Sequence, residues 1–565
     1  MSVELPVLTI RQMLRRSAER YGPYPALSWV GGEPINYTEV YESAQTLSVW
    51  LMERGIGFGD SVAILSENCP NWGVVYFAVT SMGAIAVPIL TDFHPEAIQY
   101  IIRHSDAKAV FVSEKLFPKV EDAEFAPRPL FVNMETFEVM EQGITKDRMK
   151  ELKSAGMREF HKVKDRVLRL TNMVPHEPGE EDVACIIYTS GTTGHSKGVV
   201  LTHRNIMSDA VGVTEFISFS TKDRMLSILP LPHTYECTLG LVLPAIHGAH
   251  VQYMDKPPTA RALLPALAAV KPTVMASVPL VIEKIYRNAI LPRFTKTKLH
   301  RFLYSIPAVR KILHKAAGKK LLETFGGCLR LCAIGGAPLA PDVELFLREA
   351  HFPYAVGYGL TETSPLCTGS SSETTRYLSS GYPMRDVQMR INSPDENGEG
   401  EIVVKGPNVM REYYKSPQGT ADVFTEDGWL RTGDLGKIDG DGYVFIKGRL
   451  KNLILGPSGE NIYPEEVESL LCQSPYVLEA LVYQHENKLA ARIHLDQARL
   501  DEEFAGMSVE ETQAKRKEIL EALRREVNSK VSSFVRLHVM IFQPEPFEKT
   551  PTQKVKRYLY TGIEA

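Results

Sequence analysis

The chain has 565 residues, about twice the length at which a single hydrophobic core usually stops growing, so two or more domains are expected. Hydrophobic residues make up 44% of it and charged residues 23%, which excludes a largely disordered chain. The formal net charge of -4 gives no general attraction to nucleic acid, so a phosphate-bearing partner has to be met at a local basic site, which suits small phosphates better than DNA.

The first third of the chain predicts helices that alternate with short buried strands. Residues 1–22 alternate apolar and charged side chains without an apolar run, which predicts an amphipathic helix rather than a secretory signal. Helical spacing of apolar residues covers Thr38–Arg54, and the apolar run Ser61–Leu65 predicts a strand after it. The apolar pattern continues over Trp72–Ile89, and Ala109–Val112 predicts another buried strand. This alternation indicates an α/β fold with largely parallel sheets.

The middle of the chain continues this alternation. Candidate strands lie at Met225–Leu229, Thr273–Val278 and Leu329–Ile334. The apolar segment Leu239–Ala249 is too short to span a membrane and is expected in the core. Residues 284–320 hold eleven Lys or Arg and no Asp or Glu. Such a segment is either a solvated helical face or a surface that meets an anionic membrane or substrate, and the sequence leaves both open.

From Gly381 onward the composition changes, and glycines and prolines separate short predicted strands such as Glu401–Val404 and Tyr443–Ile446. This pattern predicts a β-rich subdomain. After residue 449 a strand, helix, strand, helix pattern begins, at Leu453–Leu455, Pro464–Leu471, Val477–Tyr483 and Val509–Val527. The sequence therefore predicts a large N-terminal domain over residues 1–448, with two α/β subdomains and the β-rich one, and a small mobile α+β C-terminal domain over residues 449–565.

The seven cysteines are scattered along the chain and form no C-x-x-C pair. Their odd number and irregular spacing do not resemble a disulfide framework or a zinc site. We therefore expect reduced thiols, a cytoplasmic location and no structural zinc. Contact with the inner face of a membrane through residues 284–320 remains open, and the oligomeric state is not predicted.

The loop Tyr188–Gly198, YTSGTTGHSKG, follows the apolar run Ala184–Tyr188 and so lies at the end of a predicted strand. Its glycines and hydroxyl side chains can wrap phosphate oxygens with N–H and O–H donors. It is not a Walker A loop, because its glycines stand three apart and Lys197 precedes Gly198 rather than Ser or Thr. Taken alone, the loop is as well explained by an ordinary turn.

Three later segments add the other groups that a nucleotide site needs. Small residues at Gly335–Leu339 follow a predicted strand and let a flat ring approach the backbone. Gly357–Thr363 then combines an aromatic face, a hydroxyl donor and a carboxylate suited to Mg²⁺. Asp434, at the end of Trp429–Asp434, can accept hydrogen bonds from two ribose hydroxyls. Each segment in isolation also fits a plain turn or a helix cap.

The order YTSGTTGHSKG, LPLPHTYE, GGAPL, GYGLTE, WLRTGD, GRLKN, SGENIYPEEVE and KTPTQKVKR resembles the motif series of the adenylate-forming superfamily. That superfamily comprises acyl-CoA synthetases, peptide-synthetase adenylation domains and beetle luciferases. The resemblance spans Thr38–Arg557 and is closest in texture to long-chain fatty acyl-CoA synthetases. It implies an AMP-forming ligase that uses ATP, Mg²⁺ and coenzyme A to convert a carboxylic acid into acyl-AMP and then into a thioester.

The resemblance also implies roles for individual residues of the large domain. The triphosphate would be bound by Thr189, Ser190, Gly191, Thr192, Thr193, Gly194 and Lys197. The adenine would pack against Gly336, Ala337, Pro338 and Tyr358, and Gly359 is grouped with the cofactor-binding residues. Asp434 and Arg449 would hold the ribose, Thr361 the α-phosphate and Glu362 the Mg²⁺. His233 would lie near the coenzyme A tunnel and the acyl carboxylate, although a satisfied core histidine is the alternative.

In the small domain, the resemblance implies that Lys451 is the hinge and Lys554 the catalytic lysine. This chain departs from the family pattern at two places. Gln553 stands where a glycine usually precedes the catalytic lysine, and Lys549 and Lys556 lie close by. The loop that carries Ser458 and Gly459, near the pantetheine tunnel, is one residue longer than usual.

The acid is less certain than the reaction. Acetate-activating relatives carry a tryptophan that plugs the acyl pocket at the position of Gly359, so the glycine favours a longer acid. The basic and apolar segment 284–320 also resembles long-chain fatty acyl-CoA synthetases, and a long-chain fatty acid is the first expectation. Medium-chain or aryl acids, transfer to a carrier-protein thiol, and an inactive scaffold that binds acyl ligands remain as alternatives. No nucleic acid partner is expected.

Overall fold

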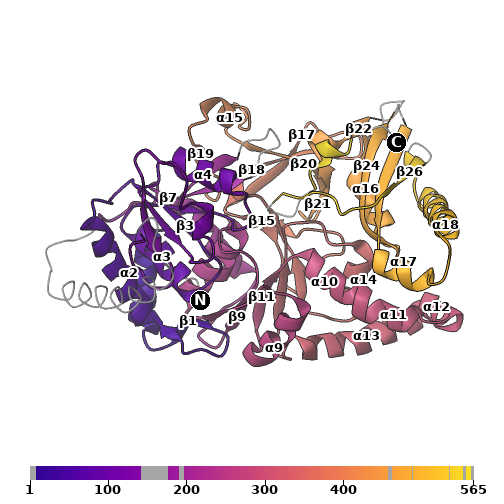
Figure 1. Cartoon of the computed structure of the whole chain (residues 1–565), viewed down its shortest axis with the longest axis horizontal. Helices are drawn as coiled ribbons and strands as arrows, with labels where there is room; N and C mark the ends of the chain where they lie inside the picture. The colour runs from indigo at the N-terminus through magenta and orange to yellow at the C-terminus, as the bar shows by residue number, and fades with distance from the viewer. Residues whose placement is uncertain are drawn as a thin grey trace.

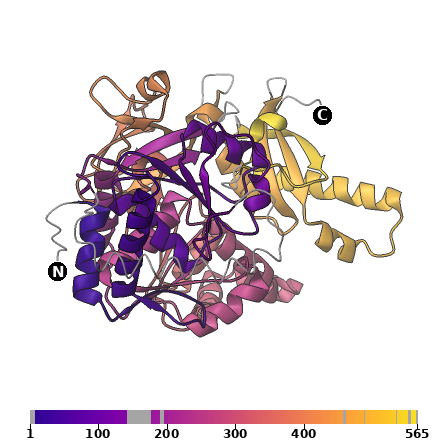
Figure 2. The same cartoon turned by 60° about the vertical axis from the view of Figure 1, so that its left-hand side comes forward.

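The computed structural model describes residues 8–140, 176–189, 196–455, 461–485, 488–532, 535–550 and 555–561. Figure 1 shows two large sheets with their helices in the indigo to pink part of the chain, a smaller set of antiparallel strands above them in orange, and the yellow C-terminal segment at one end. Figure 2 shows the same C-terminal segment standing at one side of the molecule. The mixed α/β class predicted from the sequence is confirmed.

The first sheet has seven strands in the order β19-β8-β7-β4-β3-β5-β6. Its strands are β3 Ser61–Leu65, β4 Ile85–Pro88, β5 Ala109–Val112, β6 Leu130–Asn133, β7 Val183–Thr189, β8 Lys197–Thr202 and β19 Glu412–Tyr413. Helix α2 Tyr37–Met52 precedes β3, helix α3 Pro70–Ser81 connects β3 to β4, and helix α4 Pro95–His104 connects β4 to β5. Asn36 and Glu39 form a capping box that starts α2 one residue before the predicted helix.

The second sheet also has seven strands, in the order β13-β12-β11-β9-β10-β1-β2. Its strands are β1 Pro25–Trp29, β2 Ile35–Asn36, β9 Arg224–Ser227, β10 His250–Tyr253, β11 Val274–Ser277, β12 Leu331–Ile334 and β13 Tyr354–Val356. All neighbours pair in parallel except β1 with β2. Its helices include α1 Ile10–Tyr21, α6 His203–Gly212, α8 Leu243–His247, α9 Ala260–Val270 and α14 Pro341–Glu349.

Helix α3 lies between the two large sheets. Its sequence, PNWGVVYFAVTS, carries no charged side chain, and nearly every residue of the helix is buried. It contacts β3 and β4 of one sheet and β1 of the other. A helix that is apolar on all sides has to be covered on all sides, so α3 joins both sheets in one hydrophobic core.

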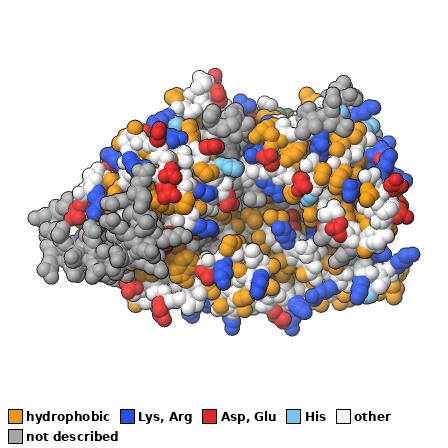
Figure 3. All heavy atoms as spheres, in the orientation of Figure 1, with side chains coloured by type: hydrophobic (Ala, Val, Ile, Leu, Met, Phe, Trp, Pro, Cys, Tyr) orange, Lys and Arg blue, Asp and Glu red, His pale blue; other side chains and the backbone are white. Residues whose placement is uncertain are grey.

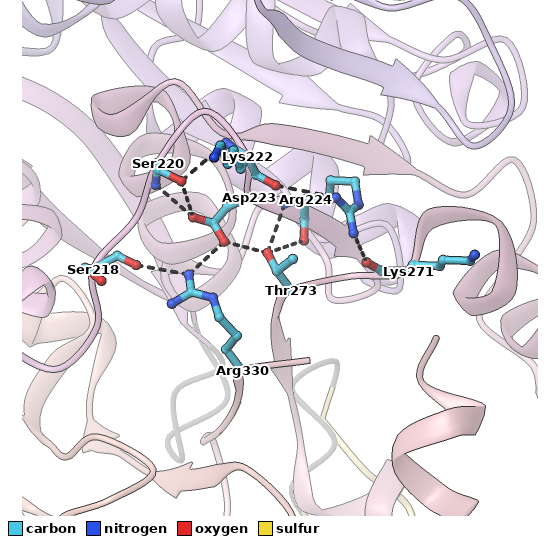
Figure 4. Close-up of polar contacts among 8 residues, drawn as sticks. All are labelled: Ser218, Ser220, Lys222, Asp223, Arg224, Lys271, Thr273 and Arg330. Carbon is cyan, nitrogen blue, oxygen red and sulfur yellow. Dashed lines mark hydrogen bonds and ion pairs between the residues drawn. The ribbon is translucent and has the colours of Figure 1, made fainter. Parts of the chain in front are cut away.

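A polar network holds the N-terminal ends of three strands of the second sheet together (Figure 4). The Asp223 carboxylate accepts hydrogen bonds from the Ser220 backbone at 2.8 Å, from the Thr273 hydroxyl at 2.7 Å and from the Arg330 guanidinium at 2.7 Å. Burial opposes ionisation of Asp223, but the hydrogen bonds from Thr273 and Arg330 outweigh it and lower its pKa. The network fixes the positions of the N-terminal ends of β9, β11 and β12. The positions of the C-terminal ends of these strands follow from this.

The β-rich part predicted after Gly381 is confirmed as an antiparallel sheet of four strands, β17-β18-β20-β21. These strands are β17 Gln388–Asn392, β18 Gly400–Lys405, β20 Leu430–Ile438 and β21 Val444–Arg449. A three-stranded sheet of β14 Tyr358–Gly359, β15 Leu366–Gly369 and β16 Tyr382–Pro383 joins it to the second large sheet.

The C-terminal unit contains β22 Ile454–Leu455, β23 Asn461–Ile462, α16 Pro464–Leu471, β24 Val477–His485, β25 Lys488–Leu495, α17 Gln497–Glu503, α18 Val509–Asn528 and β26 Leu537–Gln543. Its main hydrophobic cluster, which includes Val467, Val482 and Leu523, is separate from the clusters of the preceding residues. Lys447 on β21 contacts Glu466 at 3.0 Å, and the Tyr463 hydroxyl donates to Glu399 at 2.9 Å. The division at residues 448 and 449 stays a prediction.

Residues 279–324 form a series of short helices at one edge of the second sheet. They are α10 Pro279–Ile285, the π-helical turn Tyr286–Ile290, α11 Leu291–Thr295, α12 Lys298–Ser305 and α13 Pro307–Thr324. In Figure 1 they run along the lower right edge, below the C-terminal unit. No helix in the described part of the chain is both long enough and apolar enough to cross a membrane.

Most predicted elements are confirmed within two or three residues, and one strand ends early for a physical reason. The strand expected at Met225–Leu229 ends at Ser227, because the Leu229 carbonyl accepts a hydrogen bond from the Asn68 side chain at 2.6 Å instead of joining a strand ladder. The apolar segment expected in the core at Leu239–Ala249 is buried as predicted, and it begins in a π-helical turn at Cys237–Val242 that continues into α8.

Candidate active site

The candidate site lies at the carboxyl ends of the strands of the second sheet. His233 follows β9, Gly336 follows β12, and Tyr358 follows β13 directly. Because these strands are parallel, the segments that follow them emerge at the same edge of the sheet. This edge is where open α/β sheets bind ligands. The predicted site residues of the middle third of the chain therefore converge because of the sheet topology.

The Asp434 carboxylate is the meeting point of three of the predicted residues. Its Oδ2 accepts a hydrogen bond from the Tyr358 hydroxyl at 2.6 Å, and its Oδ1 lies 2.8 Å from Nε of Arg449. Asp434 is on β20 and pairs with Arg449 across the ladder to β21, whereas Tyr358 comes from 76 residues earlier in the chain. Burial, followed by the charge of Asp434, raises the pKa of Tyr358 well above its ordinary value, so its hydroxyl stays a donor.

This arrangement fixes the position of the Asp434 carboxylate. A carboxylate is an acceptor of the kind that ribose hydroxyls need. A cavity of about 320 Å³ lies beside Asp434, lined by Gly433, Arg449, Leu450 and Lys451. Gly433 has a φ of +67°, which a residue with a side chain rarely adopts. The glycine therefore leaves the backbone next to the Asp434 carboxylate without a side chain over it.

Gly336, Ala337 and Pro338 are exposed at the end of β12, which suits a surface on which a flat ring could pack. The adjacent Gly335 packs against the ring of Tyr235, where an added Cβ would lie 3.4 Å from the nearest ring carbon. The Tyr235 hydroxyl donates to the Ala333 carbonyl at 2.9 Å. The segment after β9 is therefore fastened to β12, and the two predicted motifs lie side by side.

His233 caps the short helix Thr234–Glu236, because its Nδ1 accepts a hydrogen bond from the Tyr235 backbone at 3.2 Å. The side chain is partly exposed. The histidine is hydrogen-bonded but not fully buried, so the alternative of a satisfied core histidine is not decided. A structural role in capping remains, and the role near the acyl carboxylate stays a prediction.

Glu362 belongs to a small chain of contacts that links two motifs. It lies with Thr361 on the 3-10 turn Thr361–Thr363, where both are partly exposed. Its Oε1 accepts a hydrogen bond from the Tyr413 hydroxyl at 2.7 Å, and Nζ of Lys197 lies 4.9 Å from the centre of the Tyr413 ring. Burial, followed by the charge of Glu362, raises the pKa of Tyr413, so this hydroxyl also remains a donor.

The surroundings of Glu362 fit a magnesium ion that arrives with its substrate. Within the described ranges no group of three or more His, Cys, Asp and Glu side chains is placed to hold a metal ion. Mg²⁺ typically uses one or two carboxylates together with substrate phosphates and water. A single carboxylate near the end of the phosphate loop is therefore the donor set expected for Mg·ATP rather than for a resident metal.

Gly359 has a structural explanation that the sequence did not reveal. A Cβ added here would lie 1.8 Å from the Pro365 carbonyl oxygen, which no real side chain can do without moving the backbone. In this conformation the glycine is required by the close approach of Gly359 and Pro365. The expectation that Gly359 by itself signals a long acyl pocket is therefore weakened, because packing alone explains the residue.

Several predicted residues lie outside the described residues. They are Ser190, Gly191, Thr192, Thr193, Gly194, Ser458, Gly459 and Lys554. The ends of the phosphate loop are described: Thr189 and Lys197 are opposite each other in the antiparallel pair β7–β8. The residues on either side of the loop are therefore held in one antiparallel ladder. Lys451 is exposed and lines the cavity, and partial desolvation, followed by the charge of Arg449, lowers its pKa.

Two features of the site carry no recognisable motif. Tyr413 lies in REYY, and only its burial and its contact with Glu362 reveal its place. Asn68 comes from the first sheet and ties the segment after β9, because its side chain donates to Ser227 Oγ at 3.0 Å and accepts from the Leu231 backbone at 2.9 Å. A side chain 163 residues away in the chain has no local signal that could predict this contact.

Glu236 lies beneath the His233 segment and is fully buried. The Ser227 hydroxyl donates to its Oε1 at 2.5 Å, while Oε2 is buried without a hydrogen-bond partner among the described residues. Burial raises the pKa of Glu236 from 4.5 to about 8, even though the Ser227 hydrogen bond favours ionisation. The carboxyl group is therefore neutral over most of the physiological range.

Replacing Glu236 with glutamine makes the protein relatively more stable as the pH rises. A raised carboxyl pKa contributes stability that is complete below about pH 4.5 and is lost as the pH rises to about 8. The neutral amide has no such loss, so the variant should gain about 1.4 kcal/mol of relative stability for each pH unit in this window. Unfolding midpoints of both proteins at pH 5 and pH 8 measure the difference.

The control for this experiment is Glu19→Gln, which changes an exposed carboxylate and should show the same difference from the wild type at both pH values. Burial lowers the pKa values of His203, His247 and His250, but these histidines are common to all three proteins, so their effects cancel. A pH-independent difference for Glu236→Gln would mean that the buried carboxyl does not titrate in this window.

Comparisons with known proteins agree with this geometry. A family model described as AMP-binding enzyme matches residues 14–414. Long chain acyl-CoA synthetase 6, peroxisomal, of Arabidopsis thaliana is 30% identical over 93% of this chain and 79% of its own length. Long-chain-fatty-acid–CoA ligase 6 of Mus musculus is 30% identical over 86% of this chain and 72% of its own.

Solved structures share the fold over nearly the whole chain. ATP-bound MatB of Rhodopseudomonas palustris superposes with a TM-score of 0.74 at 23% identity, covering 98% of both chains. The o-succinylbenzoate CoA synthetase of Bacillus subtilis, in complex with its acyl-adenylate intermediate, superposes with a TM-score of 0.71 at 21% identity, again covering 98% of both. At these identities the likeness establishes the fold alone.

Proposed function

The chain belongs to the AMP-binding enzyme family, and from this premise we propose that it activates long-chain fatty acids as their CoA thioesters. The coarser activity is that of an AMP-forming acid–thiol ligase, which uses ATP, Mg²⁺ and coenzyme A. The observation that carries the finer proposal is the match to the long-chain acyl-CoA synthetases of Arabidopsis thaliana and Mus musculus over most of both chains. Members of the family that act on other acids share the fold, as the o-succinylbenzoate CoA synthetase does.

In the proposed first step, the carboxylate oxygen of the acid attacks the α-phosphorus of ATP, forming acyl-AMP and releasing pyrophosphate. The protein's share of this step is positioning and charge stabilisation, because no covalent bond to the chain is needed. In this proposal Asp434, held by Tyr358 and Arg449, accepts hydrogen bonds from the ribose hydroxyls. Glu362 would bind Mg²⁺, and its contact with Tyr413, whose ring lies 4.9 Å from Nζ of Lys197, supports this role.

We propose that the second step, attack by the coenzyme A thiol on acyl-AMP, follows a rotation of the C-terminal unit about Lys451. Lys451 lies directly after β21, where the four-stranded sheet ends. The contacts of Lys447 with Glu466 and of Tyr463 with Glu399 join the unit to that sheet in the present arrangement. Both contacts are partly exposed polar interactions, which are weak enough to be exchanged during turnover.

The test of the proposed acid is a competition assay in which saturated acids from two to about twenty carbons compete for one limiting pool of coenzyme A. Long-chain acids should give the highest kcat/KM, because each buried methylene contributes about 0.8 kcal/mol until the pocket is filled. An optimum below about six carbons would refute the long-chain proposal while leaving the ligase activity intact. A parallel assay with an acyl-carrier-protein thiol distinguishes the acceptor, and ATP–pyrophosphate exchange excludes an inactive scaffold.

The location that fits this substrate is the cytoplasm, with contact at the inner face of a membrane. Long-chain acids partition into bilayers, so an enzyme that meets the membrane surface encounters them at high local concentration. The basic segment 284–320 supports this location, because its cations are carried on exposed helices rather than buried.

A further inference from the structure

We infer that helix α12, with the start of α13, is a docking surface for anionic lipid bilayers. Three of its apolar side chains follow helical spacing at i, i+3 and i+4, and all three are exposed: Leu299 by 65%, Phe302 by 64% and Leu303 by 38%. Ile306, between α12 and α13, is exposed by 36%. In a globular protein such a stripe normally faces the core. This inference specifies the membrane contact proposed above, but its test does not depend on which acid is used.

Helix α12 buries few side chains against the rest of the protein. Of the residues of α12, only Tyr304 is not exposed. Its ring stacks on Phe294 with the ring centres 5.5 Å apart, and its hydroxyl lies 3.0 Å from the Tyr286 hydroxyl. One aromatic residue therefore anchors α12, and the apolar stripe is left over for a partner outside the described chain.

The charged side chains beside the apolar stripe indicate which kind of partner would bind α12. Two arginines of segment 284–320 hold this segment to α14. Arg287 lies 3.2 Å from Asp342, and Arg310 lies 2.8 Å from Glu349. The four lysines on either side of the stripe in the sequence make no ion pair within the described part of the chain, and all four are exposed. They are Lys296, Lys298, Lys311 and Lys315. Residues 284–320 contain no acidic residue that could neutralise them.

An apolar stripe flanked by free lysines fits the interface of a membrane with anionic lipids. Leucine and phenylalanine side chains enter the boundary between headgroups and acyl chains, while lysines remain at the level of the phosphates. Exposed Ile312, at 70%, adds a further apolar side chain on the first turns of α13. Figure 3 shows orange and blue side chains interspersed along the lower right edge, where α11–α13 lie in Figure 1.

The C-terminal unit borders this surface without covering it. The charge of Arg301 acts on Tyr476, which precedes β24, so one side of α12 faces that unit. The apolar stripe remains exposed in the same arrangement. A membrane docked on α12 would thus lie next to the unit that is proposed to rotate during turnover.

The test is cosedimentation of the full chain with vesicles of phosphatidylcholine, alone or with about 30 mol% phosphatidylglycerol, at low and high salt. Binding should require the anionic lipid and weaken as salt is raised. Replacing Lys296 and Lys298 with glutamine should weaken partitioning about twenty- to thirtyfold, from about fivefold for each lysine near the surface. Leu299→Gln together with Phe302→Gln should reduce it at least tenfold, because the stripe no longer buries apolar area.

The matched control is Val509→Gln with Lys517→Gln, which removes an exposed apolar residue and an exposed lysine from α18. It should bind vesicles like the wild type, and unfolding midpoints of all variants should agree, since every replaced side chain is exposed. Wild-type protein that ignores anionic vesicles at low salt would overturn the inference. So would equal binding of the α12 variants, or a dimer in size-exclusion chromatography that the α12 variants dissociate, because the stripe would then be a contact between copies.

Discussion

We expect replacement of Lys554, the proposed catalytic lysine, with alanine to lower the rate of acyl-adenylate formation by about a hundred- to a thousandfold. Negative charge grows on the phosphoryl oxygens and on the leaving pyrophosphate, and one preorganised cation is worth about two to four kcal/mol there. Thioester formation from preformed acyl-AMP should change little, because in that step the lysine is proposed to have left the site with the C-terminal unit. ATP–pyrophosphate exchange measures the first step, and coenzyme A consumption from supplied acyl-AMP measures the second.

Two neighbouring lysines provide the controls for Lys554. Lys549 is paired with Glu479, and Lys556 lies 3.2 Å from Glu548, so each already has a carboxylate partner in the C-terminal unit. Lys556→Ala should therefore leave both half-reactions close to wild type. Normal exchange in Lys554→Ala would remove its catalytic role, and an equal loss in both half-reactions would refute the division of labour between them.

Replacing Glu362 with glutamine should lower the adenylation rate at limiting Mg²⁺ by about a hundredfold, and high Mg²⁺ should restore part of it. The amide keeps an oxygen that can still accept the Tyr413 hydrogen bond, so the change removes the negative charge and little else. Mg²⁺ prefers a charged oxygen ligand, and Glu362 is the carboxylate that the motif places there. The measurement is ATP–pyrophosphate exchange as a function of Mg²⁺ concentration.

Two further variants separate the charge of Glu362 from its position. Tyr413→Phe removes the 2.7 Å hydrogen bond but keeps the carboxylate, so it should cause a smaller loss than Glu362→Gln. Glu412→Gln changes the neighbouring exposed carboxylate, which pairs with Arg411, and should leave the Mg²⁺ dependence unchanged. A Glu362→Gln enzyme with a wild-type Mg²⁺ profile would show that the metal is held elsewhere.

The sequence predicted the secondary structure well where the pattern was local. Ser61–Leu65, Ala109–Val112 and Pro464–Leu471 have the bounds expected from their apolar runs and helical spacing. The strand expected at Met225–Leu229 was too long, because the Asn68 side chain takes the Leu229 carbonyl out of the ladder. That interaction joins residues 161 apart in the chain, so no local pattern contains it.

The candidate site was predicted as a set of residues but not as an arrangement. The motif order identified Tyr358, Asp434 and Arg449 separately, and the structure joins them through one carboxylate. Tyr413 was missed, because a buried tyrosine outside a motif has no sequence signal. Gly359 was interpreted through the acyl pocket, whereas the structure explains it by the approach of the Pro365 carbonyl.

The sequence by itself determined the family and the α/β class and proposed the candidate site residues, because periodicity and motif order are properties of short segments read in turn. Only the tertiary structure decided which groups share a carboxylate, why Glu236 is neutral and why the stripe on α12 has no partner in the described chain. These features depend on burial and on contacts between residues far apart in the chain. Both arise when sheets and helices pack, and neither is encoded at any one position.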